Sequence, residues 1–195
     1  MNTVVIDSGH GGSDPGKVGI NDVLEKDINL KIAKRVEKEL KEKGYKVVMT
    51  REKDEMLTKE DSGNIKVKDM KARVELINET APGLAVSIHQ NSYHEEEIHG
   101  AQVFYFSHSE EGMEAAKLIQ QSLLSVDEEN KRQEKANDTY YLLRRTQVPT
   151  VIVECGFLSN QKEAEHLIQK NYQDKIAKAI VEGIDTYLKK VSASE

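Results

Sequence analysis

The fold is decided by the stretch Thr3-Val4-Val5-Ile6-Asp7-Ser8-Gly9-His10-Gly11-Gly12, in which β-branched residues run into an acid, a histidine and glycines. A continuous β-branched run is typical of a strand that is covered on both faces of a sheet. Glycines allow the sharp turn that follows such a strand. Open α/β sheets carry their chemistry at the carboxyl ends of the strands. The stretch therefore predicts a buried strand that delivers His10 to a functional edge.

Outward from this strand, helical and extended patterns alternate along the chain. Apolar runs predict further strands over 45–50, 84–89, 101–106 and 150–154. Helical periodicity predicts helices over 25–43, 67–79, 110–125, 139–145 and 172–190. Another helix is expected after Asn160, its N-cap, with Glu163 at the reciprocal capping position, and residues 51–66 are expected to form a long surface loop. The pattern indicates a single α/β domain over residues 1–195, with a mostly parallel twisted sheet and helices on both faces.

Composition excludes several function classes. The formal net charge of −6 argues against a nucleic-acid binder, which normally presents a basic face. No apolar run approaches the roughly 20 residues that a membrane span needs. The single cysteine, Cys155, cannot form an internal disulfide. No signal peptide is visible, and a strand that starts at residue 3 leaves no room for one, so we expect a targeting or anchor segment to be absent from this chain.

Polar side chains follow three of the apolar strands at the points where the strands end. These are His10, His89 and Glu154, and Glu25 starts the first helix, which returns to the same edge. Zinc binds imidazole nitrogen and carboxylate oxygen, and a catalytic zinc has three protein ligands and leaves its fourth position for water. Two histidines and one glutamate meet that count. The other glutamate can take a proton from the water and pass it to a leaving amine, which predicts amide hydrolysis.

Each of these residues alone also has an ordinary structural explanation. His10 could be a loop histidine that bonds to backbone, and His89 could be a core histidine at a strand end. Glu25 could simply favour the positive end of the helix dipole. Glu154 is the hardest to explain in this way, because a carboxylate after an apolar strand is costly unless it is paired or coordinates a metal. The convergence of all four residues favours a metal site.

The remaining candidates are weaker. Cys155 is predicted to be a small buried hydrophobic residue rather than a nucleophile, because the sequence fixes no basic group beside it. Arg51, Arg73 and Arg132 could be surface charges or could bind an anionic substrate. His99 precedes Gly100 in an acidic loop and could line a groove.

The motifs resemble those of a known family, the zinc-dependent N-acetylmuramoyl-L-alanine amidases of the amidase 3 type. The matching pieces keep the family's order and cover almost the whole chain: 6–12, 24–27, 50–54, 87–91, 100–105 and 153–160. The stretch from Tyr140 to Cys155 is most similar to the sporulation and germination members. Any one motif alone is weak, but as a set they are very specific.

The resemblance implies that His10, Glu25 and His89 bind one zinc ion and that Glu154 is the catalytic glutamate. The implied reaction cuts the amide between the lactyl group of N-acetylmuramic acid and L-alanine in peptidoglycan. The sporulation members suggest a role in spore cortex maturation, where muramic δ-lactam forms, and in germination. The location would then be extracytoplasmic, on the cell-wall or cortex side of the membrane.

Substrate contacts are expected from Asn91 and Arg132. Because the chain has no tryptophan and few aromatic residues, ring stacking on the glycan is expected to be minor. The chain also departs from the family, with Ser8 and Gln90 where proline and alanine are frequent, and Gln133 where glycine often follows the arginine. No counterpart of the inhibitory helix of cell-division members is evident, so any control would come from an activating partner protein.

Two other functions stay open at this point. A zinc peptidase could cut within the stem peptide, and mass analysis of the products would separate it from an amidase. Alternatively, a non-catalytic domain that binds the wall or a partner could hold a structural metal. Such a site is normally closed by a fourth protein ligand, for which His99 is the best candidate.

Overall fold

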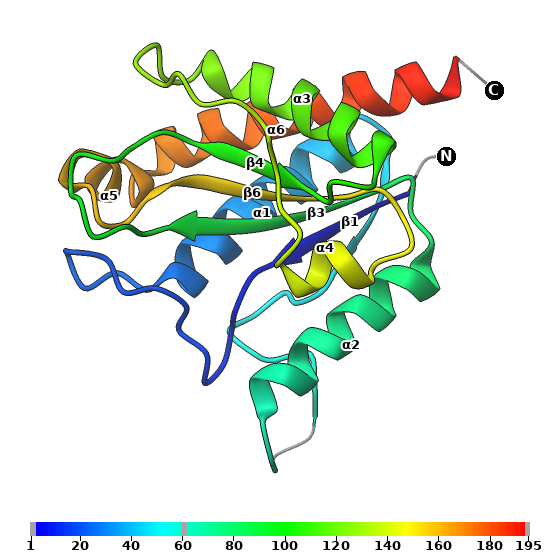
Figure 1. Cartoon of the computed structure of the whole chain (residues 1–195), viewed down its shortest axis with the longest axis horizontal. Helices are drawn as coiled ribbons and strands as arrows, with labels where there is room; N and C mark the ends of the chain where they lie inside the picture. Colours follow the sequence, from blue (N-terminus) through cyan, green and yellow to red (C-terminus); the bar gives the residue numbers. More distant parts are fainter. Residues whose placement is uncertain (1–2, 60–61, 194–195) are drawn as a thin grey trace.

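Six strands form one sheet in the order β2-β1-β3-β6-β4-β5 (Figure 1). Their bounds are β1 Thr3–Ser8, β2 Lys46–Met49, β3 Leu84–Asn91, β4 Gln102–Tyr105, β5 Lys135–Ala136 and β6 Thr150–Phe157. The structure is a computed structural model and describes residues 3–59 and 62–193. The two ends of the predicted 1–195 domain, and positions 60 and 61 of the predicted 51–66 loop, lie outside the described residues.

The sheet is mostly parallel, as predicted. β1 pairs in parallel with both β2 and β3, and β3 pairs in parallel with β6. β4 is antiparallel to β6, and the short β5 is parallel to β4. The pattern did not indicate β5, because its two residues, Lys135 and Ala136, are exposed at the edge of the sheet and show no apolar run.

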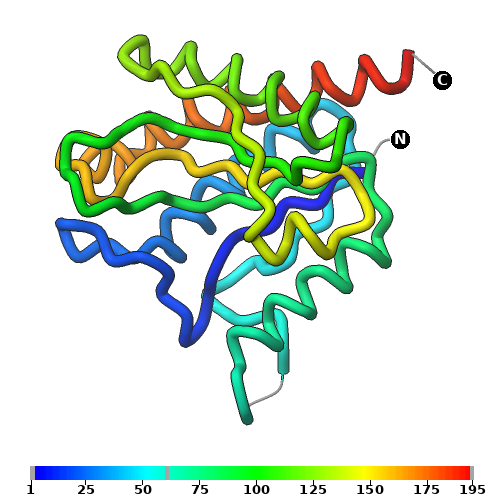
Figure 2. Tube along the Cα trace, in the orientation of Figure 1, coloured from blue at the N-terminus to red at the C-terminus, as the bar shows by residue number. Residues whose placement is uncertain are grey.

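Helices cover both faces of the sheet, which also confirms the prediction (Figures 1 and 2). In the described part of the chain the helices are α1 Glu25–Glu42, α2 Ile65–Thr80, α3 Glu110–Leu124, α4 Tyr141–Arg145, α5 Gln161–Leu167 and α6 Lys170–Ser192. One apolar cluster packs α1, α3 and α6 against the sheet, and a smaller one packs α2 and α4 against the other face. Among these described helices, none combines the length and the apolar character that crossing a membrane requires.

The face beneath α2 and α4 changes from apolar to polar along the strands. Val5, Ala85 and Ile152 belong to the apolar cluster on this face. Side chains alternate between the faces of a strand, so every second residue continues the same face. The residues that continue it toward the carboxyl ends of the strands are Asp7, Ser87, His89 and Glu154. The alternation therefore gathers four polar groups on one face of the functional edge.

The predicted N-cap of α5 is confirmed, but the predicted reciprocal bond is wrong. The side chain of Asn160 accepts a hydrogen bond from the Glu163 amide at 3.0 Å. The Glu163 carboxylate does not return this bond and instead accepts from the amides of Phe157 at 2.8 Å and Gly100 at 3.1 Å. The carboxylate is therefore already occupied by two other backbone amides. Glu163 thereby joins the end of β6 to the loop before β4.

Candidate metal centre

Three of the sequence-predicted residues, His10, Glu25 and His89, meet at the carboxyl edge of the sheet. One candidate ligand atom from each lies within 4.8 Å of the others. The Nδ1 atom of His89 is 2.9 Å from Glu25 Oε1, and the Nε2 atom of His10 is 3.2 Å from Glu25 Oε2. The two imidazole rings meet edge to face, with their centroids 5.0 Å apart. Two ring nitrogens and a carboxylate thus converge on one point.

Local backbone features place these ligands. His10 lies in the turn after β1 with φ of 61°, a left-handed conformation that is uncommon outside glycine. Glu25 is the first residue of α1 and is buried. Burial opposes its negative charge, but the positive N-terminal end of the helix dipole favours that charge. Gly9 allows the His89 ring to approach the turn, because a Cβ at position 9 would lie 2.2 Å from that ring.

The electrostatics of the trio concentrate negative charge on Glu25. Burial alone would raise the pKa of Glu25, but hydrogen bonds with His10 and His89 hold it far below its ordinary value. Burial would lower the pKa of His89, and the hydrogen bond and charge of Glu25 instead raise it to about 9. Backbone amides of Lys17 and Gln90 also donate to the Glu25 carboxylate, at 2.8 and 3.1 Å. An ionised carboxylate between two imidazoles suits a divalent cation of borderline softness.

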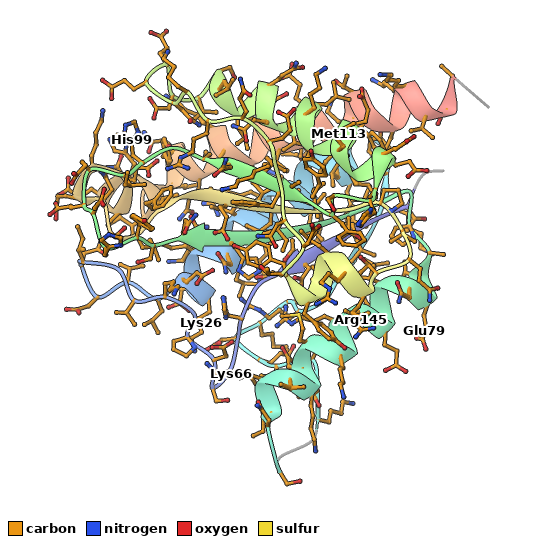
Figure 3. All side chains as sticks on the ribbon, in the orientation of Figure 1. Lys26, Lys66, Glu79, His99, Met113 and Arg145 are labelled. Atoms are coloured by element: carbon orange, nitrogen blue, oxygen red, sulfur yellow. The ribbon has the colours of Figure 1, made fainter. Side chains whose placement is uncertain are left out.

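Asp14 supports the trio from the side and was not singled out from the sequence. Its Oδ2 atom is 2.7 Å from Nδ1 of His10, and its Oδ1 atom pairs with Lys66 at 2.7 Å. Lys66 lies near the start of α2 (Figure 3). Metal-binding histidines commonly donate the second ring N–H to a carboxylate, which fixes the orientation of the ring. The spacing of an acid four residues after His10 in a glycine-rich turn was the available signal.

Two buried arginines hold the turn that carries His10. Arg73 donates to the backbone carbonyls of Ser8 and His10, both at 2.7 Å. Arg51 donates to the carbonyls of Ser8 and Gly9, both at 3.0 Å. The interpretation of these two arginines as surface charges is therefore wrong, because they are only 3% and 2% exposed. A substrate contact by either arginine stays a prediction. Their guanidinium groups are used inside the protein, where they fix three successive carbonyls.

Asp7 lies beneath the site and forms an ion pair with Arg73. Its carboxylate accepts hydrogen bonds from Arg73 at 2.6 Å, Thr50 at 2.7 Å and Ser87 at 2.5 Å. Burial opposes ionisation, but the charge of Arg73 and the hydroxyl hydrogen bonds outweigh it and lower the pKa of Asp7 to about 2. Asp69 binds the Nε side of Arg73 at 2.8 Å. The buried guanidinium is thus paired on two sides.

Glu154 lies beside the trio without belonging to it. It is in register with His89 across the β3–β6 pair and is only 7% exposed. Its Oε2 atom is buried and has no hydrogen-bond partner. Burial raises the pKa of Glu154 to about 7, against the lowering effect of His89. The structure therefore places a carboxylate with one unpaired oxygen at the edge of the sheet where His10, Glu25 and His89 meet.

Two adjoining cavities open around these residues. The larger, of about 410 Å³, is lined by the trio together with Lys17 and Lys66. The smaller, of about 90 Å³, is lined by Glu154 and Tyr140. Asp7, Met70 and His89 line both. Glu154 and the trio therefore face one continuous region.

The two predicted substrate contacts lie farther along this edge. Asn91 Oδ1 accepts from the Ser92 amide at 2.8 Å. Arg132 donates to the carbonyl of His99 at 2.7 Å, and its guanidinium lies 4.7 Å from the centroid of the Phe157 ring. The substrate roles of Asn91 and Arg132 stay predictions.

His99 and Cys155 lie apart from the trio. His99 lines a separate cavity near α5, so it does not supply the fourth ligand that a closed structural site needs. Cys155 packs in the apolar cluster on the opposite face of the sheet, and burial raises the pKa of its thiol. Its predicted role as a buried hydrophobic residue is confirmed.

Known proteins are similar to this chain over nearly the whole of its length. The family described as N-acetylmuramoyl-L-alanine amidase matches residues 4–186. The germination-specific N-acetylmuramoyl-L-alanine amidase of Bacillus subtilis is 40% identical over 187 residues, which are 94% of this chain and 78% of that protein.

Solved structures agree with the sequence relatives. The CwlD amidase of Clostridioides difficile, in complex with the GerS lipoprotein, superposes with a TM-score of 0.93 at 39% identity, covering 97% of this chain and 99% of that one. The catalytic domain of CwlV, an amidase from Bacillus (Paenibacillus) polymyxa var. colistinus, gives a TM-score of 0.85 at 31% identity, covering 97% and 99%. The likeness extends over the whole sheet and its helices.

Proposed function

Because the chain belongs to the N-acetylmuramoyl-L-alanine amidase family, we propose that it is a zinc-dependent enzyme that cuts the amide between N-acetylmuramic acid and L-alanine in peptidoglycan. The observation that carries the proposal is the meeting of His10, Glu25 and His89 beside the vacant carboxylate oxygen of Glu154. Three ligands and a neighbouring base are the set that metal-assisted hydrolysis requires.

The donor atoms fit zinc. His10 and His89 offer imidazole nitrogen and Glu25 offers an ionised carboxylate, and Asp14 fixes the ring of His10. When bound, a zinc ion would supply Lewis-acid polarisation of the scissile carbonyl and would lower the pKa of the attacking water. Within the described chain, no fourth His, Cys, Asp or Glu joins the trio, which favours a catalytic over a structural role.

Glu154 is assigned the proton transfers. It accepts a proton from the attacking water as the water oxygen bonds to the lactyl carbonyl carbon. The bond from that carbon to the alanine nitrogen then breaks, and Glu154 returns the proton to the departing amine. A group that must accept and then donate a proton works best when its pKa is close to the working pH, and the burial of Glu154 shifts its pKa in that direction.

The relatives support a more specific setting. One is named as germination-specific in Bacillus subtilis, and the CwlD amidase of Clostridioides difficile was solved with the GerS lipoprotein. We therefore assign this chain to spore cortex peptidoglycan, in maturation and germination, on the extracytoplasmic side of the membrane. We also propose that a partner protein activates this chain.

Metal analysis combined with peptidoglycan digestion tests this function. The purified protein should contain one zinc per chain and should release stem peptides that begin with a free L-alanine amine, and a chelator should stop the release. Mass analysis of the products separates the alternatives. Cleavage within the stem peptide would show a peptidase, bound zinc without digestion would show a structural metal, and digestion that resists complete zinc removal would refute the zinc assignment.

A further inference from the structure

The small cavity beside Glu154 has an apolar wall that the reaction described above does not use. Its wall includes Met70, Tyr140, Leu142 and Ile152, and its polar end is formed by His89 and Glu154 together with Asp7 and Ser87. At about 90 Å³ it is much smaller than the neighbouring cavity of about 410 Å³ that the trio lines. We call it the Glu154 cavity. It is suited to a small apolar group that is attached to a polar one.

Glu154 indicates which polar group belongs there. Its buried Oε2 atom has no hydrogen-bond partner within the described chain, and leaving a buried carboxylate oxygen unpaired is costly. A ligand N–H beside this oxygen would satisfy it. Under the proposed function, the alanine nitrogen is the substrate atom that exchanges a proton with Glu154. The substituents of that nitrogen must therefore lie in or against the Glu154 cavity.

We infer that the Glu154 cavity receives the side chain of the residue whose nitrogen is released, and that its apolar wall selects a methyl group over larger side chains. The inference rests on the proposed function and adds the residues that determine specificity. An alanine methyl is two bonds from the nitrogen, so a nitrogen held at Glu154 brings the methyl within reach of the wall. The muramoyl side of the bond is left to the larger cavity.

Three of the side chains in this wall are held in place by packing, and a fourth is adaptable. Leu142 and Ile152 are 3% and 5% exposed and belong to the apolar cluster beneath α2 and α4. The Tyr140 ring packs edge to face on Phe104, with centroids 5.7 Å apart, and the Tyr140 amide donates to Asn137. Met70 is only partly buried, and its side chain is unbranched. Met70 is therefore the position at which the size of the cavity can be changed with least damage to the fold.

The test compares two soluble muropeptides that differ only in the first residue of the stem, L-alanine or L-valine. The full zinc-loaded protein should hydrolyse the valine substrate with a kcat/KM at least about 10-fold lower, because added carbons in a fixed apolar pocket discriminate on this scale. Met70→Ala should reduce that discrimination about 5-fold or more. Met113→Ala on α3, which is exposed on the far side of the sheet, should leave it unchanged (Figure 3).

The outcomes separate this inference from the proposed function. Equal hydrolysis of both substrates by the unmodified protein would overturn the inference, and so would a discrimination that Met70→Ala leaves unchanged. Zinc content and a thermal melt show whether the variant is folded, and Met70→Val replaces it if it is not. Failure to cleave the alanine substrate at all would instead refute the amidase proposal itself.

Discussion

The guanidinium of Arg73 donates a hydrogen bond of 2.7 Å to the backbone carbonyl of His10, 63 residues away in the sequence. His10 has a left-handed backbone conformation that a residue with a Cβ adopts at an energetic cost. The fork of Arg73 also binds Ser8 and Asp7, so it holds both sides of the turn. An arginine on α2 thus fixes the position of a metal ligand that follows β1.

Replacing Arg73 should weaken metal binding before it abolishes folding. Arg73→Lys keeps the positive charge, but an ammonium group cannot bind Asp7 and the carbonyls of Ser8 and His10 with the planar geometry of a guanidinium. We therefore expect at least a 10-fold loss of zinc affinity, measured by competition with a chromophoric chelator. Arg73→Met leaves Asp7 buried without its cation and should cost about 3–5 kcal/mol of unfolding free energy. Arg35→Lys, which alters a partly exposed pair with Asp174, is the matched control. An unchanged zinc affinity in Arg73→Lys would show that the fork does not position His10.

The amide variant Glu154→Gln should separate metal binding from turnover. It removes the proton carrier but leaves His10, Glu25 and His89 in place, so the zinc content should stay near one per chain. Turnover on muropeptides should fall by about 10²–10⁴-fold, the usual contribution of a general base. Glu129→Gln, at an exposed pair with Lys162, should have no effect. Near-native turnover in Glu154→Gln would exclude Glu154 as the base.

Two glycines with similar backbone conformations should respond differently to alanine. A Cβ at Gly16, where φ is +69°, would lie 2.5 Å from Glu25 Oε2 and 2.7 Å from a carbon of the His10 ring. A Cβ at Gly44, where φ is +87°, would meet nothing within 4 Å. Gly44→Ala should therefore lower the free energy of unfolding by only about 1–2 kcal/mol, the cost of placing a residue with a Cβ in the left-handed region, and should keep full activity. Gly16→Ala should also displace two ligands, with a loss of zinc affinity measured by the same chelator competition.

Acid should unfold the protein partly through Asp7. Its pKa is lowered from an ordinary 3.8 to about 2 in the folded state. A carboxyl group with a lowered pKa stabilises the fold above its unfolded pKa, and this contribution is lost as the pH falls toward the folded value. We expect about 2 kcal/mol of unfolding free energy to disappear between about pH 4 and pH 2. Urea titrations across this range should show a shallower loss in Asp7→Asn, and parallel curves would contradict the assignment.

The strands and the trio could be predicted because their signals are local. Strand β1 is a continuous apolar run, and His10, His89 and Glu154 follow such runs directly. Parallel pairing then brings the strand ends together whatever the intervening loops do. Glu25 could be placed because a helix after β1 must begin at the same edge.

The supporting residues could not be predicted because their partners are distant. Arg73 lies in a charged helical stretch, where an arginine usually points to solvent, and only the tertiary fold shows that it reaches Asp7 and His10. Glu163 matched a local capping pattern, but the amides of Gly100 and Phe157 competed successfully for its carboxylate. Tyr140 carries no local signal of its own, since its place in the wall of the Glu154 cavity depends on how α4 packs on β6.

The alternation along β3 has a consequence for how this protein tolerates insertions and deletions. Ser87 and His89 face the site, while Val86 and Ile88 face the large apolar cluster. A shift of the strand register by one residue would exchange these two sets. The imidazole of His89 would then lie in the apolar cluster, and the side chain of Ile88 would face the site. Length changes in loops that lie away from the carboxyl edge of the sheet leave the site residues in place. Within this strand, however, a change of a single residue would destroy the fold and the enzyme together, so its spacing should be inherited intact.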